Sequence, residues 1–213
     1  VIGVKSLFLV AVTGFILGLV FTLQSRPTLL KFGAQSWMPS MIVLSIVREI
    51  GPVVIALICA GKIGSGMGAE LGSMRVTEQI DAMEVSGTNP FKYLVVTRIM
   101  ATTLMLPILV IFGDAVAIVG SALVENLKGE VSYQLYFIQI FDALKFSDLI
   151  PATIKTFFFG FAIGLVGFYK GYNCENGTVG VGEASNSAVI YASMLLFVLD
   201  FIAVFITDIF YGV

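Results

Sequence analysis

The sequence predicts an all-α integral membrane protein with about five transmembrane helices, and three observations support this class. Hydrophobic residues make up 58% of the 213 positions and charged residues only 12%, whereas soluble domains carry about 25% charged residues. The mean hydropathy is +0.99. Apolar runs recur along the chain, and a helical run of about 20 residues, rising about 1.5 Å per residue, crosses a hydrocarbon core of about 30 Å.

The apolar runs divide a single transmembrane domain, residues 1–213, into five predicted spans. These spans are residues 4–23, 40–69, 91–124, 148–172 and 187–211. The loop expected between the first two spans contains Trp37, and tryptophan is typical of a membrane interface. Ser147 is the expected N-cap of the fourth span. Because the chain starts at Val1, without a methionine or the basic start of a signal peptide, we expect that an N-terminal segment is missing from it.

Three shorter stretches lie between these spans. Residues 132–145 bring aromatic and aliphatic side chains to helical spacing, which predicts an extracytoplasmic amphipathic helix that lies on the membrane or on a partner. Residues 77–87 predict a short polar helix. Residues 173–186 are rich in glycine and polar side chains and are expected to form a loop. Within it, we interpret Asn176-Gly177-Thr178 as a turn rather than as a glycosylation acceptor.

The composition excludes several classes of function. A formal net charge of −2 provides no basic face for nucleic acid. The sequence has no histidine, which is the usual general base and the commonest metal ligand. Cys59 lies in an apolar run and Cys174 in a polar loop, so the two cysteines predict neither a disulfide nor a zinc site. We therefore expect no catalytic residue and no bound metal.

A ladder of small residues runs through the second half of the second span, and its members fall every four residues. They are Ala60, Gly64, Gly68 and Gly72. Small residues along one helical stripe allow two helix backbones to approach closely in a membrane. The alternative, a phosphate-binding glycine loop, lacks the required spacing around Gly61-Lys62 and has no preceding strand. The pattern therefore favours close helix packing.

The short helix expected at residues 77–87 has two possible roles. Thr77 can cap it and Gly87 can end it, and Ile80 and Met83 are expected to form a small apolar patch. At about 10 residues the helix is too short to span a membrane. It is either a solvated connector or a docking helix for a soluble partner. The distribution of lysine and arginine weakly favours the cytoplasmic side for this helix.

The adjacent pair Arg48–Glu49 lies near the start of the second span. Each ionised side chain costs at least about 2.5–3.5 kcal/mol at the centre of a membrane helix, so such residues usually face a cavity or a partner. Because neighbouring helical residues point about 100° apart, the pair cannot neutralise itself. Either both side chains reach the headgroup region, or they line a polar site. Asp148 and Lys155 lie on the same side of the membrane, and Asp200 lies in the middle of the fifth span.

Several motifs together have the character of one known family. Residues 47–101 contain REIGP, the ladder AG–GS–GAELG and the segment RVTEQIDAMEV, and the later stretches FFFGFAIGLVGFYKGYN and TVGVGEASNSAV lead into the fifth span with Asp200. In this combination the chain resembles the MlaE-type permease family, the membrane subunits of lipid-transporting ABC systems. The resemblance covers Leu44 to the C-terminus.

The resemblance implies a fold and a set of partners. The family has five spans after an N-terminal interfacial helix, lies in the bacterial cytoplasmic (inner) membrane, and acts as a homodimer on a dimer of cytoplasmic ABC ATPase subunits. ATP and Mg bind to those subunits, so no cofactor is expected in this chain and ATP hydrolysis is expected elsewhere. A small regulatory STAS-domain subunit and a periplasmic hexamer of MCE-domain proteins are further implied partners. The implied function is phospholipid transport between the inner membrane and the MCE conduit, which contributes to outer-membrane lipid asymmetry.

The resemblance also implies roles for individual residues. The substrate is expected between the two permease copies, near charged positions that match Arg48, Glu49, Lys155 and Asp200. Residues 77–87 match the coupling helix that contacts the ATPase. The coupling residues are Glu78, Gln79, Ile80, Asp81, Met83 and Glu84.

Two other functions remain open from the sequence. One is an ion- or proton-coupled secondary carrier that uses Glu49, Asp200 and Asp208, although five spans do not divide into two equal repeats. The other is a membrane scaffold without transport, against which the charged residues inside the spans argue. Transport without any ATPase would favour the carrier.

Overall fold

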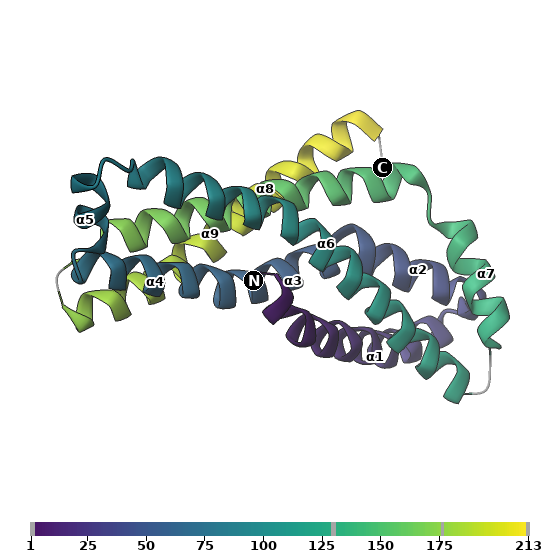
Figure 1. Ribbon diagram of the computed structural model, residues 1–213. Helices are drawn as coiled ribbons and strands as arrows, with labels where there is room; N and C mark the ends of the chain where they lie inside the picture. The colour runs from purple at the N-terminus through teal and green to yellow at the C-terminus, as the bar shows by residue number, and fades with distance from the viewer. Residues whose placement is uncertain (1–2, 129–130, 176, 212–213) are drawn as a thin grey trace.

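The computed structural model describes residues 3–128, 131–175 and 177–211, and every regular element in these ranges is helical. Five helices are long and apolar enough to cross a membrane. The predicted fold class, an all-α integral membrane protein, is confirmed. The helices form an elongated bundle in which α5 lies at one end and α7 at the other (Figure 1).

The second span is one continuous helical rod, Met38–Val76, that contains two π-helical turns. Its parts are α2 (Met38–Ser45), the π turn η3 (Ile46–Ile50), α3 (Gly51–Cys59), the π turn η4 (Ala60–Gly64) and α4 (Ser65–Val76). The other helices are α1 (Leu7–Lys31), α5 (Gln79–Val85), α6 (Pro90–Leu127), α7 (Tyr133–Ala143), α8 (Phe146–Tyr172) and α9 (Thr178–Tyr211). At 38 residues, α6 is about 57 Å long, which exceeds the hydrocarbon core.

Two segments expected to be loops are helical. Residues 24–31 continue α1 through Pro27, because Arg26 is buried against α6, where its guanidinium lies 3.5 Å from the Glu125 carboxylate. Residues 178–186 form the start of α9, where the Ser185 hydroxyl donates to the Ser65 carbonyl of α4. Asn176, part of the expected turn, lies outside the described residues. Contacts with residues distant in the sequence therefore stabilise the additional length of α1 and α9.

Two expected helix caps are also wrong. The fourth span begins at Phe146 with Lys145 as its N-cap, and the Asp148 carboxylate accepts from the Lys145 backbone N–H, so Ser147 lies inside the first turn. The Thr77 hydroxyl donates back to the Ser73 carbonyl and does not cap the short helix α5. The rod instead continues to Val76, seven residues beyond the predicted end.

Close backbone contacts hold α6 against α1 and α8. A Cβ added at Gly18 of α1 would overlap the Ala117 carbonyl of α6, and one at Gly160 of α8 would meet the Thr102 carbonyl at 2.6 Å. Of the ladder residues, Gly68 makes a similar contact, since the α9 backbone lies 3.0 Å from its Cβ position, whereas the Cβ position of Gly64 is 3.7 Å from the Ile163 side chain. Small residues thus replace the hydrophobic effect as the basis of helix packing in a membrane.

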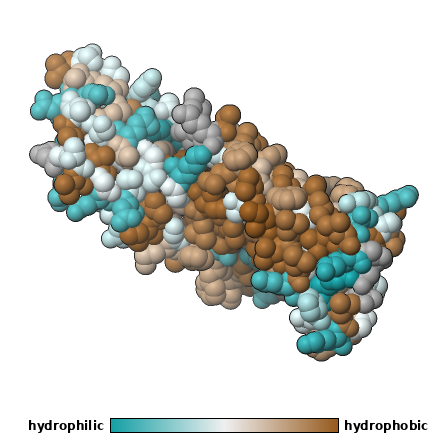
Figure 2. All heavy atoms as spheres, turned by 90° about the horizontal axis from the view of Figure 1, so that it is seen from below, coloured by the Kyte–Doolittle hydropathy of each residue, from teal (hydrophilic) through white to brown (hydrophobic). Residues whose placement is uncertain are grey.

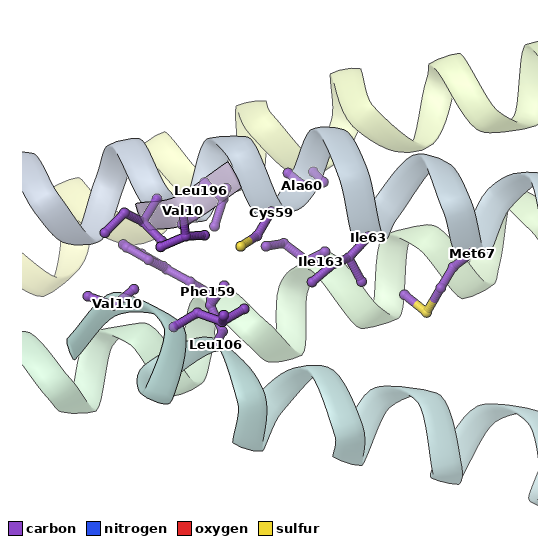
Figure 3. Close-up of a cluster of buried hydrophobic side chains, with 14 residues drawn as sticks. Val10, Cys59, Ala60, Ile63, Met67, Leu106, Val110, Phe159, Ile163 and Leu196 are labelled. Atoms are coloured by element: carbon purple, nitrogen blue, oxygen red, sulfur yellow. The ribbon is translucent and has the colours of Figure 1, made fainter. Parts of the chain in front are cut away.

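The main apolar core joins five helices near the middle of the bundle (Figure 3). Phe159 of α8 and Leu106 of α6 are almost fully buried there, with Cys59 at the end of α3. On the face drawn in Figure 2, the surface along the middle of the bundle is strongly apolar, whereas the surface at the α5 end is more hydrophilic. This distribution is what a bundle needs when its middle faces lipid and one end extends into water.

A buried polar network attaches α7 to the bundle. Ser121 of α6 accepts hydrogen bonds from the Thr22 hydroxyl of α1, at 2.7 Å, and from the Tyr136 hydroxyl of α7, at 2.6 Å. All three side chains are fully buried. Burial raises the pKa of Tyr136 to about 12, because it disfavours the phenolate. The amphipathic helix expected at residues 132–145 is therefore anchored on its buried side by hydrogen bonds and not by apolar contact alone.

Candidate functional site

The π turn η3 directs two adjacent charges at two different residues of α8. The Arg48 guanidinium forms a salt bridge with Asp148, with Nε 3.0 Å from Oδ1. The Lys155 ammonium lies 2.7 Å from the Glu49 carboxylate. Because Asp148 and Lys155 are seven residues apart, they occupy the same face of α8, two turns apart. The expectation that Arg48 and Glu49 do not neutralise each other therefore agrees with the geometry.

Lys155 is shared by two carboxylates. Its ammonium also donates to Asp200 Oδ1 of α9 at 3.0 Å. The Lys155 side chain is only 6% exposed, whereas the Glu49 side chain is 46% exposed. The lysine thus lies at the base of the site, and the partly exposed carboxylate faces the open space. The four residues carried over from the family resemblance come together here, with Asp148 as an additional partner.

Four of these charged residues line a cavity of about 400 Å³ between η3, α8 and α9: Arg48, Glu49, Asp148 and Lys155. Arg48 and Glu49 form one wall, and the start of α8 forms another. The third wall is the last part of α9, where Phe201, Phe205 and Asp208 face the space. A cavity of this size is within the range of small-ligand sites.

An apolar groove of about 680 Å³ adjoins the charged cavity. The cavity and the groove share Pro151 and Lys155 of α8 and Ala203 and Thr207 of α9. The remaining lining of the groove is apolar: Ile150, Ile154, Phe158, Leu199, Ile202, Ile206 and Phe210. Lys155 therefore separates a charged compartment from an apolar one, an arrangement that suits an amphipathic ligand.

Asp114 is a buried carboxylate to which the sequence assigned no role. It lies on α6 against Gly51, the residue that follows η3, and a Cβ at Gly51 would overlap Asp114 Oδ1. That oxygen has no hydrogen-bond partner within the part of the chain that the structure describes. The only signal for Asp114 in the sequence was that an acidic residue lies in a mainly apolar span. Its position beside η3 follows from the packing of α6 against α3, which the sequence does not show.

The helix α5 differs in one respect from the expected docking helix. Ile80 is fully buried among Leu71, Leu94 and Phe168, because it fills the space where α4, α6 and α8 meet. Ile80 is therefore not available to a partner, whereas Met83 is only partly buried against the same cluster. The side chains that α5 leaves exposed are mainly polar or charged: Glu78, Gln79, Asp81, Ala82, Glu84 and Val85.

The site shows no arrangement for metal binding. Within the described residues, no three histidine, cysteine, aspartate or glutamate side chains are close enough together to hold a metal ion. Asp148 and Glu49 are instead paired with the cations Arg48 and Lys155. The arrangement can bind charged and apolar groups of one ligand, but it places no nucleophile beside a general base.

An apolar bundle with five helices able to cross a membrane and a charged cavity between three of them defines the class of multi-pass membrane proteins. The family model described as Permease MlaE matches residues 1–206. The chain therefore belongs to the MlaE permease family, and the resemblance derived from its motifs is confirmed.

Individual relatives agree with this assignment. The chain is 39% identical over 212 residues to a probable ABC transporter permease protein of Rickettsia prowazekii (strain Madrid E), covering 100% of this chain and 81% of the relative. It is 33% identical over 203 residues to the intermembrane phospholipid transport system permease protein MlaE of Haemophilus influenzae, covering 95% and 78%. A probable ABC transporter permease protein of Synechocystis is 32% identical, covering 94% and 76%.

Proposed function

We propose that this chain is the permease subunit of an ATP-driven ABC transporter that moves glycerophospholipid between the inner membrane and a periplasmic MCE-protein conduit. The observation that carries the proposal is the charged cavity joined to an apolar groove at Lys155. A phospholipid has the same division between a charged headgroup and apolar chains. The name of the Haemophilus relative supports the same substrate class.

The proposal assigns ATP hydrolysis and Mg binding to a separate dimer of cytoplasmic ATPase subunits. The exposed polar side chains of α5 would contact that dimer, with Glu78, Gln79 and Glu84 free to reach a partner. Asp81 is positioned within the chain by its 2.6 Å contact with Arg75. The further partners of the proposal are a second copy of the chain, a regulatory STAS-domain subunit and a periplasmic MCE hexamer, which together would support outer-membrane lipid asymmetry.

Lipid transfer in proteoliposomes tests this function. The permease and its ATPase would be reconstituted with fluorescent phospholipid, and transfer to acceptor vesicles carrying the MCE protein would be followed with and without ATP. We expect ATP-dependent transfer that is lost in the Lys155→Met variant and kept in the control Lys128→Met, which changes an exposed lysine at the end of α6. Absence of transfer with all components present would contradict the proposal.

The same experiment separates the alternative function. A proton-coupled carrier would use the carboxylates of Glu49 and Asp200, which share Lys155, together with Asp208. Transfer that follows an imposed pH gradient and does not need the ATPase would favour this carrier. Transfer that needs ATP and is unaffected by the gradient would exclude it.

A further inference from the structure

The charged cavity contains more carboxylates than cations. Arg48 is matched by Asp148, and Lys155 is shared by Glu49 and Asp200. Each cation therefore already has a carboxylate partner within the protein, and one carboxylate of the Lys155 group remains in excess.

Asp208 adds a second uncompensated carboxylate. It lies on the cavity wall formed by the end of α9 and is exposed. Among the residues that the structure describes, no cation lies within ion-pair distance of it.

The accessible groups of the cavity have opposite charges. The Arg48 side chain is 37% exposed despite its salt bridge, so its remaining guanidinium donors can reach a phosphate. The Lys155 ammonium is buried between two carboxylates and is not available in the same way. The exposed acidic groups are Glu49 and Asp208. The cavity therefore offers one site for an anion and two for a cation.

We propose that the cavity selects phospholipids whose headgroup carries an ammonium group beside the phosphate, with Asp208 binding the ammonium and Arg48 binding the phosphate. This inference rests on the proposed function, since it names the headgroup class for that site. A purely anionic headgroup would bring its charge toward the excess carboxylates without an ammonium to compensate them. In a two-fold symmetric dimer both copies contribute the same charges, so carboxylates also outnumber cations in the dimer.

The size of the preference follows from one ammonium–carboxylate pair. At about 4 Å, such a pair corresponds to roughly fivefold in binding at the dielectric constant of water and to roughly a thousandfold at about 20. Because Asp208 is exposed, its contribution lies near the water limit. We therefore expect about tenfold preference for the zwitterionic headgroup over the anionic one. The preference should decrease at high salt, because the cavity is open to solvent and exposed charges are screened.

The test is competitive lipid binding to the intact permease–ATPase complex. The complex would be equilibrated in mild detergent with equal amounts of phosphatidylethanolamine and phosphatidylglycerol of identical acyl chains, and the bound lipids would be quantified by mass spectrometry. The wild type should retain about ten phosphatidylethanolamine molecules for each phosphatidylglycerol. Asp208→Asn should bring the ratio close to one, and Asp208→Lys should reverse it. Asp208→Glu and the control Asp142→Asn, an exposed carboxylate on α7, should keep the wild-type ratio.

The possible outcomes separate this inference from the proposed function. Equal binding of the two lipids by the wild type would overturn the headgroup preference and leave lipid binding intact. A preference that persists in both Asp208→Asn and Asp208→Lys would overturn the role of Asp208. Binding of neither lipid by the wild-type complex would contradict the proposed function itself.

Discussion

Replacing Lys155 by methionine is the change that most directly perturbs the charged site. Methionine keeps an unbranched side chain, shorter only by the missing ammonium, so Glu49 and Asp200 lose the cation that both contact, at 2.7 Å and 3.0 Å. Removing one partner of a buried ion pair costs about 3–5 kcal/mol. Because the Glu49 side chain is 46% exposed and can recover part of its hydration, we expect about 3 kcal/mol, at the lower end of this range.

Thermal unfolding in a single detergent would measure this loss of stability. We expect Lys155→Met to lower Tm by roughly 6–12 °C, since about 1 kcal/mol corresponds to about 2–4 °C for a chain of this size. The triple variant Lys155→Met/Glu49→Gln/Asp200→Asn removes all three charges and should recover most of the loss. Lys128→Met, at an exposed position, should change stability by less than about 0.5 kcal/mol. A Tm of Lys155→Met equal to that of the wild type, or a triple variant less stable than the single one, would refute this reasoning.

Three further changes test other parts of the structure. Glu84→Arg, on the exposed face of α5, should prevent co-purification of the ATPase without lowering Tm. The control Asp142→Arg on α7 should leave the ATPase bound. If Glu84→Arg retained the ATPase, this would count against the coupling role of α5. Gly18→Ala should lower the free energy of unfolding by about 1–3 kcal/mol, because its Cβ would overlap the α6 backbone. Gly61→Ala has no atom within 4 Å of its Cβ position and should stabilise the protein by about 0.5–1 kcal/mol. Equal Tm values for the two variants would contradict the close α1–α6 contact. Tyr136→Phe should lower the free energy of unfolding by about 1 kcal/mol. Because burial raises the pKa of Tyr136 to about 12, the wild type should lose this advantage in stability as the pH rises from about 10 to 12. An ultraviolet titration curve that is the same for the wild type and Tyr136→Phe would contradict the burial of the phenol.

The sequence predicted the class of fold and the existence of the spans because both depend on local composition. It did not predict the full length of α1 and α9, because these helices are extended by contacts such as Arg26 with Glu125 and Ser185 with Ser65. Such contacts join positions about 100 residues apart, so no local pattern contains them.

The charged site was partly predictable. The cost of burying Arg48 and Glu49 indicated that each needs a partner, and the family motifs indicated Lys155 and Asp200. The direct pairing of Arg48 with Asp148 required the structure, since it depends on the angle between η3 and α8.

The sequence did not predict the accessibility of the apolar patch expected on α5. Ile80 and Met83 have the spacing of a docking surface, but the same spacing allows Ile80 to fill a space within the chain. Sequence periodicity identifies the apolar face of a helix and does not say whether that face meets its own chain or a partner. The position of α4, α6 and α8 decided this point.

Photocrosslinking with a phospholipid that carries a diazirine in one acyl chain tests the central claim most directly. We predict that, after irradiation of the intact complex in nanodiscs, the crosslinked peptides concentrate at the α8–α9 groove, around Phe158 and Ile206, and that Lys155→Met reduces this labelling. Labelling that is no stronger in the groove than on the exposed side of α1, around Phe8 and Ile16, and that Lys155→Met leaves unchanged, would contradict the assignment of a phospholipid site to this cavity and groove.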